Sequence, residues 1–106
     1  MKVLIDECLP RRLARELPGH EARTVPQMGW AGKHNGELLA LMAGQFEAFI
    51  TIDGNLRHQQ NPAKLTLGLV VLHAPSNRIE DVRPLIPSIL AALPQITPGQ
   101  IVHVAF

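Results

Sequence analysis

Short aliphatic runs alternate along this chain with segments whose apolar residues recur every three or four positions, and this alternation restricts the fold more than any other feature. The runs predict five strands, at residues 3–5, 21–25, 48–52, 67–72 and 101–106. Residues 67–72 are almost continuously aliphatic, which is typical of a strand covered on both faces. We expect the last strand to lie at an edge of the sheet.

Three segments between the strands have the apolar spacing of helices. The first covers residues 9–17, with a proline near its start and a Pro-Gly pair after it. The second begins at Asn35, which is a suitable N-cap. The third contains prolines, so we expect either a helix that starts near Pro84 or a kinked one that starts near Asn77, ended by Pro94.

Strands that alternate with helices imply right-handed crossovers and a parallel sheet with helices on both faces. The predicted fold is therefore a three-layer α/β/α sandwich with a mostly parallel sheet of about five strands. The chain has 106 residues, enough for one domain, which we expect to span residues 1–106. Hydrophobic residues make up 46% and charged residues 18%, a balance that argues against a disordered chain.

Charge and cysteine content restrict the surroundings of the protein. The net charge of +1 disfavours a surface that coats nucleic acid nonspecifically, but it allows a local basic patch. Cys8 is the only cysteine, so no intrachain disulfide forms, which fits a reducing compartment. No apolar stretch approaches the ~20 residues of a membrane helix, and the run before Asp6 is too short for a signal peptide. We expect a cytoplasmic protein with no membrane partner.

Acidic residues gather at the predicted strand ends. Asp6 and Glu7 follow the first strand, Asp53 follows the third, and Glu37 lies in the first turn of the second helix. Binding sites of open parallel sheets form at the carboxyl ends of the strands, so we expect these acids to converge with residues 73–78, which follow the fourth strand. Mg²⁺ and Mn²⁺ prefer carboxylate and water oxygens. The sequence thus predicts a metal site that can polarise a phosphodiester and activate a water molecule.

Each of these acids also has a purely structural explanation. Asp6 is placed to cap the helix that follows it, and Asp53 begins an ordinary Asp-Gly turn. Glu7 points away from Asp6 along an extended backbone, as a surface acid does, and Glu37 suits the positive end of a helix dipole. Spacing alone leaves the metal-binding and the structural explanations open.

Three segments resemble the motifs of a known family. Residues 3–9, Val-Leu-Ile-Asp-Glu-Cys-Leu, resemble the hydrophobic–D-E-N/C-L opening of small PIN-like proteins of uncharacterised function. Residues 49–53, Phe-Ile-Thr-Ile-Asp, resemble the T-x-D motif of their third strand. Residues 36–39 resemble the acid at the head of their second helix. The resemblance covers the N-terminal half by motif and the remainder by the order of the elements.

The resemblance implies a PIN-like domain, related to metal-dependent ribonucleases and to the VapC-type toxins of toxin–antitoxin pairs. It implies that Asp6, Glu37 and Asp53 are catalytic, that these three and Glu7 bind Mg²⁺ or Mn²⁺, and that RNA is the substrate. A protein antitoxin and a second copy of the chain are further candidate partners. Active PIN nucleases usually carry another acid shortly after the third-strand aspartate, where this chain has Asn55. The alternative is therefore a catalytically weakened PIN-like module that binds RNA or a protein partner.

Basic and polar residues near the predicted acids are candidates for substrate binding. Arg11 and Arg15 lie one turn apart on the first predicted helix, where they can contact phosphates. Asn55, Arg57 and His58 follow the third strand and are expected at the same edge of the sheet. A solvated helix face is the alternative explanation for either arginine.

Overall fold

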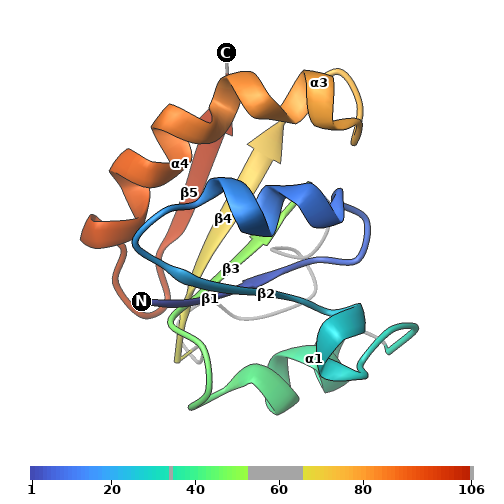
Figure 1. Cartoon of the computed structure of the whole chain (residues 1–106). Helices are drawn as coiled ribbons and strands as arrows, with labels where there is room; N and C mark the ends of the chain where they lie inside the picture. The colour runs from blue at the N-terminus through green and yellow to red at the C-terminus, as the bar shows by residue number, and fades with distance from the viewer. Residues whose placement is uncertain (34, 53–65, 106) are drawn as a thin grey trace.

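The computed structural model describes residues 1–33, 35–52 and 66–105 (Figure 1). The five strands of these residues form one sheet, in which every neighbouring pair is parallel. They are β1 (Lys2–Ile5), β2 (Glu21–Thr24), β3 (Ala48–Thr51), β4 (Gly68–His73) and β5 (Ile101–Ala105). Their order across the sheet is β2-β1-β3-β4-β5. The predicted parallel α/β fold is confirmed, and so is the position of the last strand at an edge.

Helices cover both faces of this sheet (Figure 1). One face carries α1 (Asn35–Met42) and the short 3-10 helix η2 (Pro26–Met28). The other face carries the 3-10 helix η1 (Arg11–Glu16) and a C-terminal helical segment. That segment is made of α3 (Ile79–Val82), η4 (Arg83–Leu85), α4 (Ile86–Ala92) and η5 (Leu93–Gln95). The arrangement is the predicted three-layer sandwich. None of the described helices is long and apolar enough to cross a membrane.

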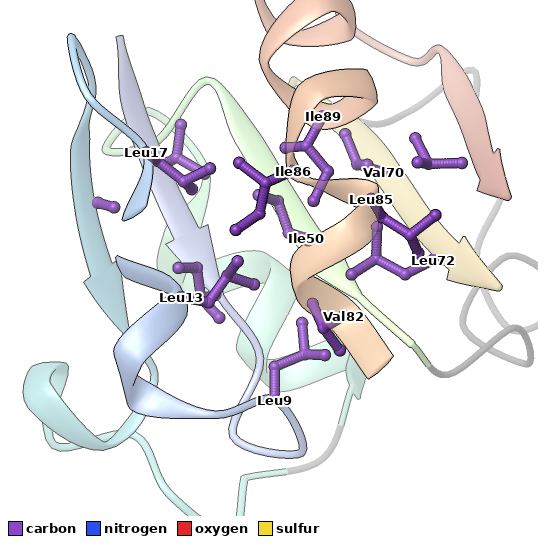
Figure 2. Close-up of a cluster of buried hydrophobic side chains, with 14 of the residues drawn as sticks. Leu9, Leu13, Leu17, Ile50, Val70, Leu72, Val82, Leu85, Ile86 and Ile89 are labelled. Carbon is purple, nitrogen blue, oxygen red and sulfur yellow. The ribbon is translucent and has the colours of Figure 1, made fainter. Parts of the chain in front are cut away.

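The continuous aliphatic runs follow from this double covering. In β1, Val3 and Ile5 pack on the face of η1 and α4, while Leu4 packs on the face of α1, and all three side chains are fully buried. Because successive side chains of a strand point to opposite faces, a strand covered twice needs apolar residues at every position. Figure 2 shows the larger cluster, in which leucines at or near η1 lie beside residues of the C-terminal helical segment on the same face of the sheet.

The first helix differs from the prediction. It is a 3-10 helix over Arg11–Glu16, preceded by Pro10 as its N-cap, and not an α-helix over residues 9–17. The backbone N–H of Leu13 donates to the carbonyl of Pro10 at 3.1 Å, an i→i+3 bond. The segment between two prolines is short, and 3-10 geometry is common in short pieces of this kind. The change matters because it alters which arginines lie side by side.

The C-terminal helical segment takes the kinked form of the two that the sequence allowed. It begins at Ile79 and changes between α and 3-10 geometry along its length. Pro84 and Pro87 each lie at the first or second position of a new piece, η4 and α4. At these positions the missing N–H of proline removes no helical bond. The prolines therefore coincide with the points at which the helical geometry changes.

Candidate functional site

The chain reverses its direction of travel across the sheet between β1 and β3. It passes from β1 to β2 on one side, and then crosses through α1 to β3 on the other side of β1. In doubly wound sheets with this strand order, ligands bind outside the carboxyl ends of the two strands that flank the reversal. Here those strand ends lead to Asp6 and Thr51.

The carboxylate of Asp6 is held by groups from both strands. Its Oδ2 accepts a hydrogen bond from Thr51 Oγ1 at 2.7 Å, across the β1–β3 reversal. Its Oδ1 accepts one from the backbone N–H of Glu7 at 2.8 Å. Thr51 is fully buried, whereas Asp6 remains partly exposed. A carboxylate oxygen offers about two acceptor positions, so the fixed carboxylate of Asp6 still has capacity for a ligand on its exposed side.

Loops from three strand ends contact one another beside Asp6. Glu7 Oε1 accepts a hydrogen bond from the backbone N–H of Gly32 at 3.1 Å, in the loop that follows η2. Gly32 has a φ of 82°, a left-handed conformation that strongly favours glycine. Asn77 Nδ2, in the loop after β4, donates to the carbonyl oxygen of Cys8 at 2.9 Å. Of the segments predicted to converge, the structure thus brings residues 73–78 against the loop that follows β1.

The thiol of Cys8 lies next to the same carboxylate. Burial raises the pKa of the Cys8 thiol above its ordinary value of 9.0, and the negative charge of Asp6 raises it further, against a hydrogen bond from the backbone of Ile52 that lowers it. A thiol with a raised pKa is protonated at neutral pH and is a poor nucleophile. Cys8 is therefore a partly buried, weakly polar group packed beside Asp6.

The other predicted ligands are placed less closely. Glu37 is exposed in the first turn of α1, with Oε1 3.8 Å from Lys33 Nζ, and no hydrogen bond or ion pair of the described residues joins it to Asp6. Asp53, Asn55, Arg57 and His58 lie outside the described residues. Within residues 1–33, 35–52 and 66–105, no group of three or more His, Cys, Asp and Glu side chains is gathered closely enough to hold a metal ion.

Two parts of the edge were not expected to bear on function from the sequence. Arg12 and Gln27 line a groove together with the predicted phosphate-binding residues Arg11 and Arg15. Thr51, the hydroxyl partner of Asp6, stands two residues before Asp53 in the T-x-D motif, but from the sequence only the aspartate of that motif is predicted as a site residue.

A pair of exposed imidazoles marks the far side of the sheet. His73 Nε2 lies 2.8 Å from His103 Nδ1, on the neighbouring strands β4 and β5. The two ring centroids are 5.0 Å apart, so the nitrogens face each other nearly in line, as in a hydrogen bond that shares one proton. β4 is the direct neighbour of β3, which ends at Thr51, and β5 is the next strand beyond β4. No protein family, curated protein or solved structure matches the chain.

Proposed function

We propose that this protein is a divalent-metal-dependent ribonuclease with Asp6 as its central metal ligand. The observation that carries the proposal is the hydrogen bond from Thr51 to Asp6 across the β1–β3 reversal. It fixes a partly exposed carboxylate at the position where sheets of this strand order bind their ligands. The PIN-like motifs around Asp6 and Asp53 supply the reaction class, and the single free thiol of Cys8 suits a reducing cytoplasm.

The residues present suit a hard cation. Mg²⁺ or Mn²⁺, when bound, would polarise a phosphodiester and lower the pKa of an attacking water molecule. Asp6 offers carboxylate oxygen, the donor type that both cations prefer. Thr51 and the backbone of Glu7 each donate to one oxygen of Asp6, which holds the carboxylate in one rotamer. Hydrogen bonds of this outer-shell kind orient metal ligands and strengthen binding.

We assign the remaining ligands to Glu7, Glu37 and Asp53, as the PIN-like motifs imply. Glu37 pairs with Lys33 in solvent, and exposed ion pairs contribute at most about 1 kcal/mol, so the pair is easily exchanged for a cation. Glu7 follows Asp6 directly and uses one carboxylate oxygen to hold the backbone of Gly32. Its other oxygen remains available to a ligand.

The test is cleavage of single-stranded RNA by the purified protein with Mg²⁺ or Mn²⁺. We expect Asp6→Asn to lower the rate by at least about 100-fold, the upper end of what the loss of an outer-shell partner costs a metal site. We expect Asp53→Asn to have the same effect. Glu21→Gln is the matched control, because Glu21 is exposed at the start of β2, away from the strand ends that carry Asp6. Metal-dependent cleavage that survives Asp6→Asn would rule out the assignment.

Asn55, where active PIN nucleases usually carry an acid, favours one alternative function. In that alternative the same edge binds RNA or a protein partner, such as an antitoxin or a second copy of the chain, without turnover. The two proposals give opposite results in one experiment. RNA binding without cleavage at any Mn²⁺ concentration supports the alternative, and cleavage that EDTA abolishes supports the nuclease.

A further inference from the structure

A groove lined by three arginines lies between η1 and η2, at the carboxyl side of the edge strand β2. Arg11, Arg12 and Arg15 line it with Ala14 and Gln27, around a volume of about 310 Å³. β2 is the direct neighbour of β1, whose carboxyl end carries Asp6. The groove and the proposed metal site therefore share one edge of the sheet.

The geometry of η1 concentrates the positive charge in this groove. In a 3-10 helix, side chains three positions apart eclipse each other, so Arg12 and Arg15 lie on the same side of η1. The acid of this helix, Glu16, is turned away from them. Its two carboxylate oxygens accept hydrogen bonds from Arg83 Nε and Nη2 at 2.9 and 3.3 Å.

The three arginines of the groove have no salt-bridge partner in the part of the chain that the structure describes. Like charges on neighbouring turns of a helix repel each other, so their grouping works against folding. The overall charge of the chain is only +1, so the grouping is a local feature and not the result of a generally basic composition. A bound anion would remove the repulsion.

Gln27 adds a fixed uncharged donor to the groove. Its Oε1 accepts a hydrogen bond from the backbone N–H of Thr24 at 2.9 Å, and its own backbone N–H donates to Thr24 Oγ1 at 3.2 Å. Because the side-chain oxygen is engaged by an N–H donor, the amide nitrogen of Gln27 is the group left for a ligand. Among the described residues that line the groove, the arginines carry donors alone, and Gln27 adds an amide donor beside an oxygen that already accepts from Thr24.

We propose that this groove binds the phosphates of single-stranded RNA beside the bond that the Asp6 site cleaves, an inference that rests on the proposed function. Guanidinium groups match phosphate oxygens in bidentate fashion. An acidic protein is the competing ligand, but protein interfaces are anchored by buried aromatic or aliphatic side chains. Among the described residues that line this groove, Ala14 is the only one with an apolar side chain.

The test measures binding without turnover. A fluorescein-labelled oligouridylate of twelve nucleotides is titrated with the protein in EDTA, and anisotropy gives the Kd at several salt concentrations. For single strands, each phosphate contact contributes about 0.7 to the slope of log K against log salt. This slope is negative. We expect Arg12→Gln and Arg15→Gln each to reduce its magnitude by about 0.7, and the double variant to reduce it by about 1.4.

Two further variants make the experiment specific to the groove. Gln27→Glu keeps the oxygen that accepts from Thr24 but places a negative charge in the groove, so we expect it to weaken RNA binding more than any single arginine substitution. Arg23→Gln is the control of equal charge change, because Arg23 is exposed on β2 but lines a different cavity, with Phe46 and Lys2. It should leave the slope unchanged.

The outcomes separate this proposal from the nuclease assignment. Because EDTA excludes metal chemistry, groove-dependent binding stands even if the protein cleaves nothing. Cleavage by the wild type, together with unchanged Kd and slope in Arg12→Gln/Arg15→Gln, would leave the nuclease intact and overturn the groove. Binding of oligoglutamate as tight as that of oligouridylate would also overturn it, in favour of an acidic protein partner.

Discussion

At the scale of single residues, the hydrogen bond from the hydroxyl of Thr51 orients the carboxylate of Asp6. The sequence places Asp6 at a strand end, because the apolar run before it stops there. It does not reveal the bond to Thr51, because that bond depends on the register in which Ile5 lies opposite Ile50. The register between parallel strands depends on helices and loops far along the chain. A local motif can therefore identify Asp6 as a candidate residue without identifying Thr51 as its hydrogen-bond partner.

Replacing Thr51 with valine removes this hydroxyl while keeping the shape of the side chain. We expect Thr51→Val to weaken Mn²⁺ binding about 10- to 100-fold, as the loss of an outer-shell hydrogen bond does at metal sites. Titration followed by Mn²⁺ electron paramagnetic resonance gives the affinity directly. Thr51→Ser is the matched control, since it retains the donor to Asp6. Equal Mn²⁺ affinities for the valine and serine variants would show that the bond does not orient a ligand.

The thiol of Cys8 reports on the charge of Asp6. Burial and the negative charge of Asp6 raise the thiol pKa, so less thiolate is present at a given pH than in the unfolded chain. We expect alkylation by iodoacetamide at pH 8, in EDTA, to be slower in the folded protein than in urea. Asp6→Asn removes one cause of the raised pKa and should speed the reaction of the folded protein. Glu7→Gln should not, because Glu7 is not among the groups that shift this thiol.

At the scale of elements, the strands were predictable and the helix types were not. Aliphatic runs such as residues 67–72 mark strands because a doubly covered sheet needs apolar residues on both faces. Helical spacing shows that residues 9–17 turn, but the same spacing fits an α-helix and a 3-10 helix. The segment between Pro10 and Pro18 is short and takes the tighter 3-10 form. In this form Arg12 and Arg15 lie on the same side of the helix. The sequence therefore predicted Arg11 and Arg15 as phosphate-binding residues, but not Arg12 and Gln27, which also line the groove.

The start of β4 depends on the absence of a side chain at Gly68. A Cβ at this position would lie 2.4 Å from Ile96 Cγ1 and 3.2 Å from the carbonyl oxygen of Thr97. Overpacking of this kind costs about 1–3 kcal/mol, so we expect Gly68→Ala to lower the free energy of unfolding by that amount in urea titrations. Adding Ile96→Ala should recover part of the loss, because it removes the atoms that clash. A Gly68→Ala protein as stable as the wild type would contradict this packing.

At the scale of the whole molecule, one sheet joins two separate clusters of buried side chains. The larger cluster contains Ile89 of α4, and the smaller one contains Phe49 of β3 and the partly buried Trp30. Ile50 and Phe49 are adjacent in β3 but belong to different clusters. Loss of packing on one face therefore disturbs the strands that the other face also needs, and we expect the domain to unfold as one cooperative unit.

Trp30 is the only tryptophan and lies against Phe46, with ring centroids 6.2 Å apart, so its fluorescence follows the smaller cluster. We expect Ile89→Ala, in the larger cluster, to lower stability by about 2–5 kcal/mol. The urea midpoints from Trp30 fluorescence and from far-ultraviolet circular dichroism should shift together. Ser88→Ala, on the exposed side of α4, is the control and should shift neither. A dichroism midpoint that moves while the fluorescence midpoint stays would show that the two faces unfold separately.

The interior position of β1 also has a consequence for biosynthesis. β1 is paired on one side with β2 and on the other with β3, and 45 residues separate Asp6 from Thr51. At about 5–20 residues per second, a ribosome needs roughly 2–9 s to make that stretch of chain. During this time β1 has at most one strand partner and an open, aliphatic edge, which is a template for wrong pairing. The nascent chain must therefore be shielded for seconds before the strand that completes the Asp6 site exists.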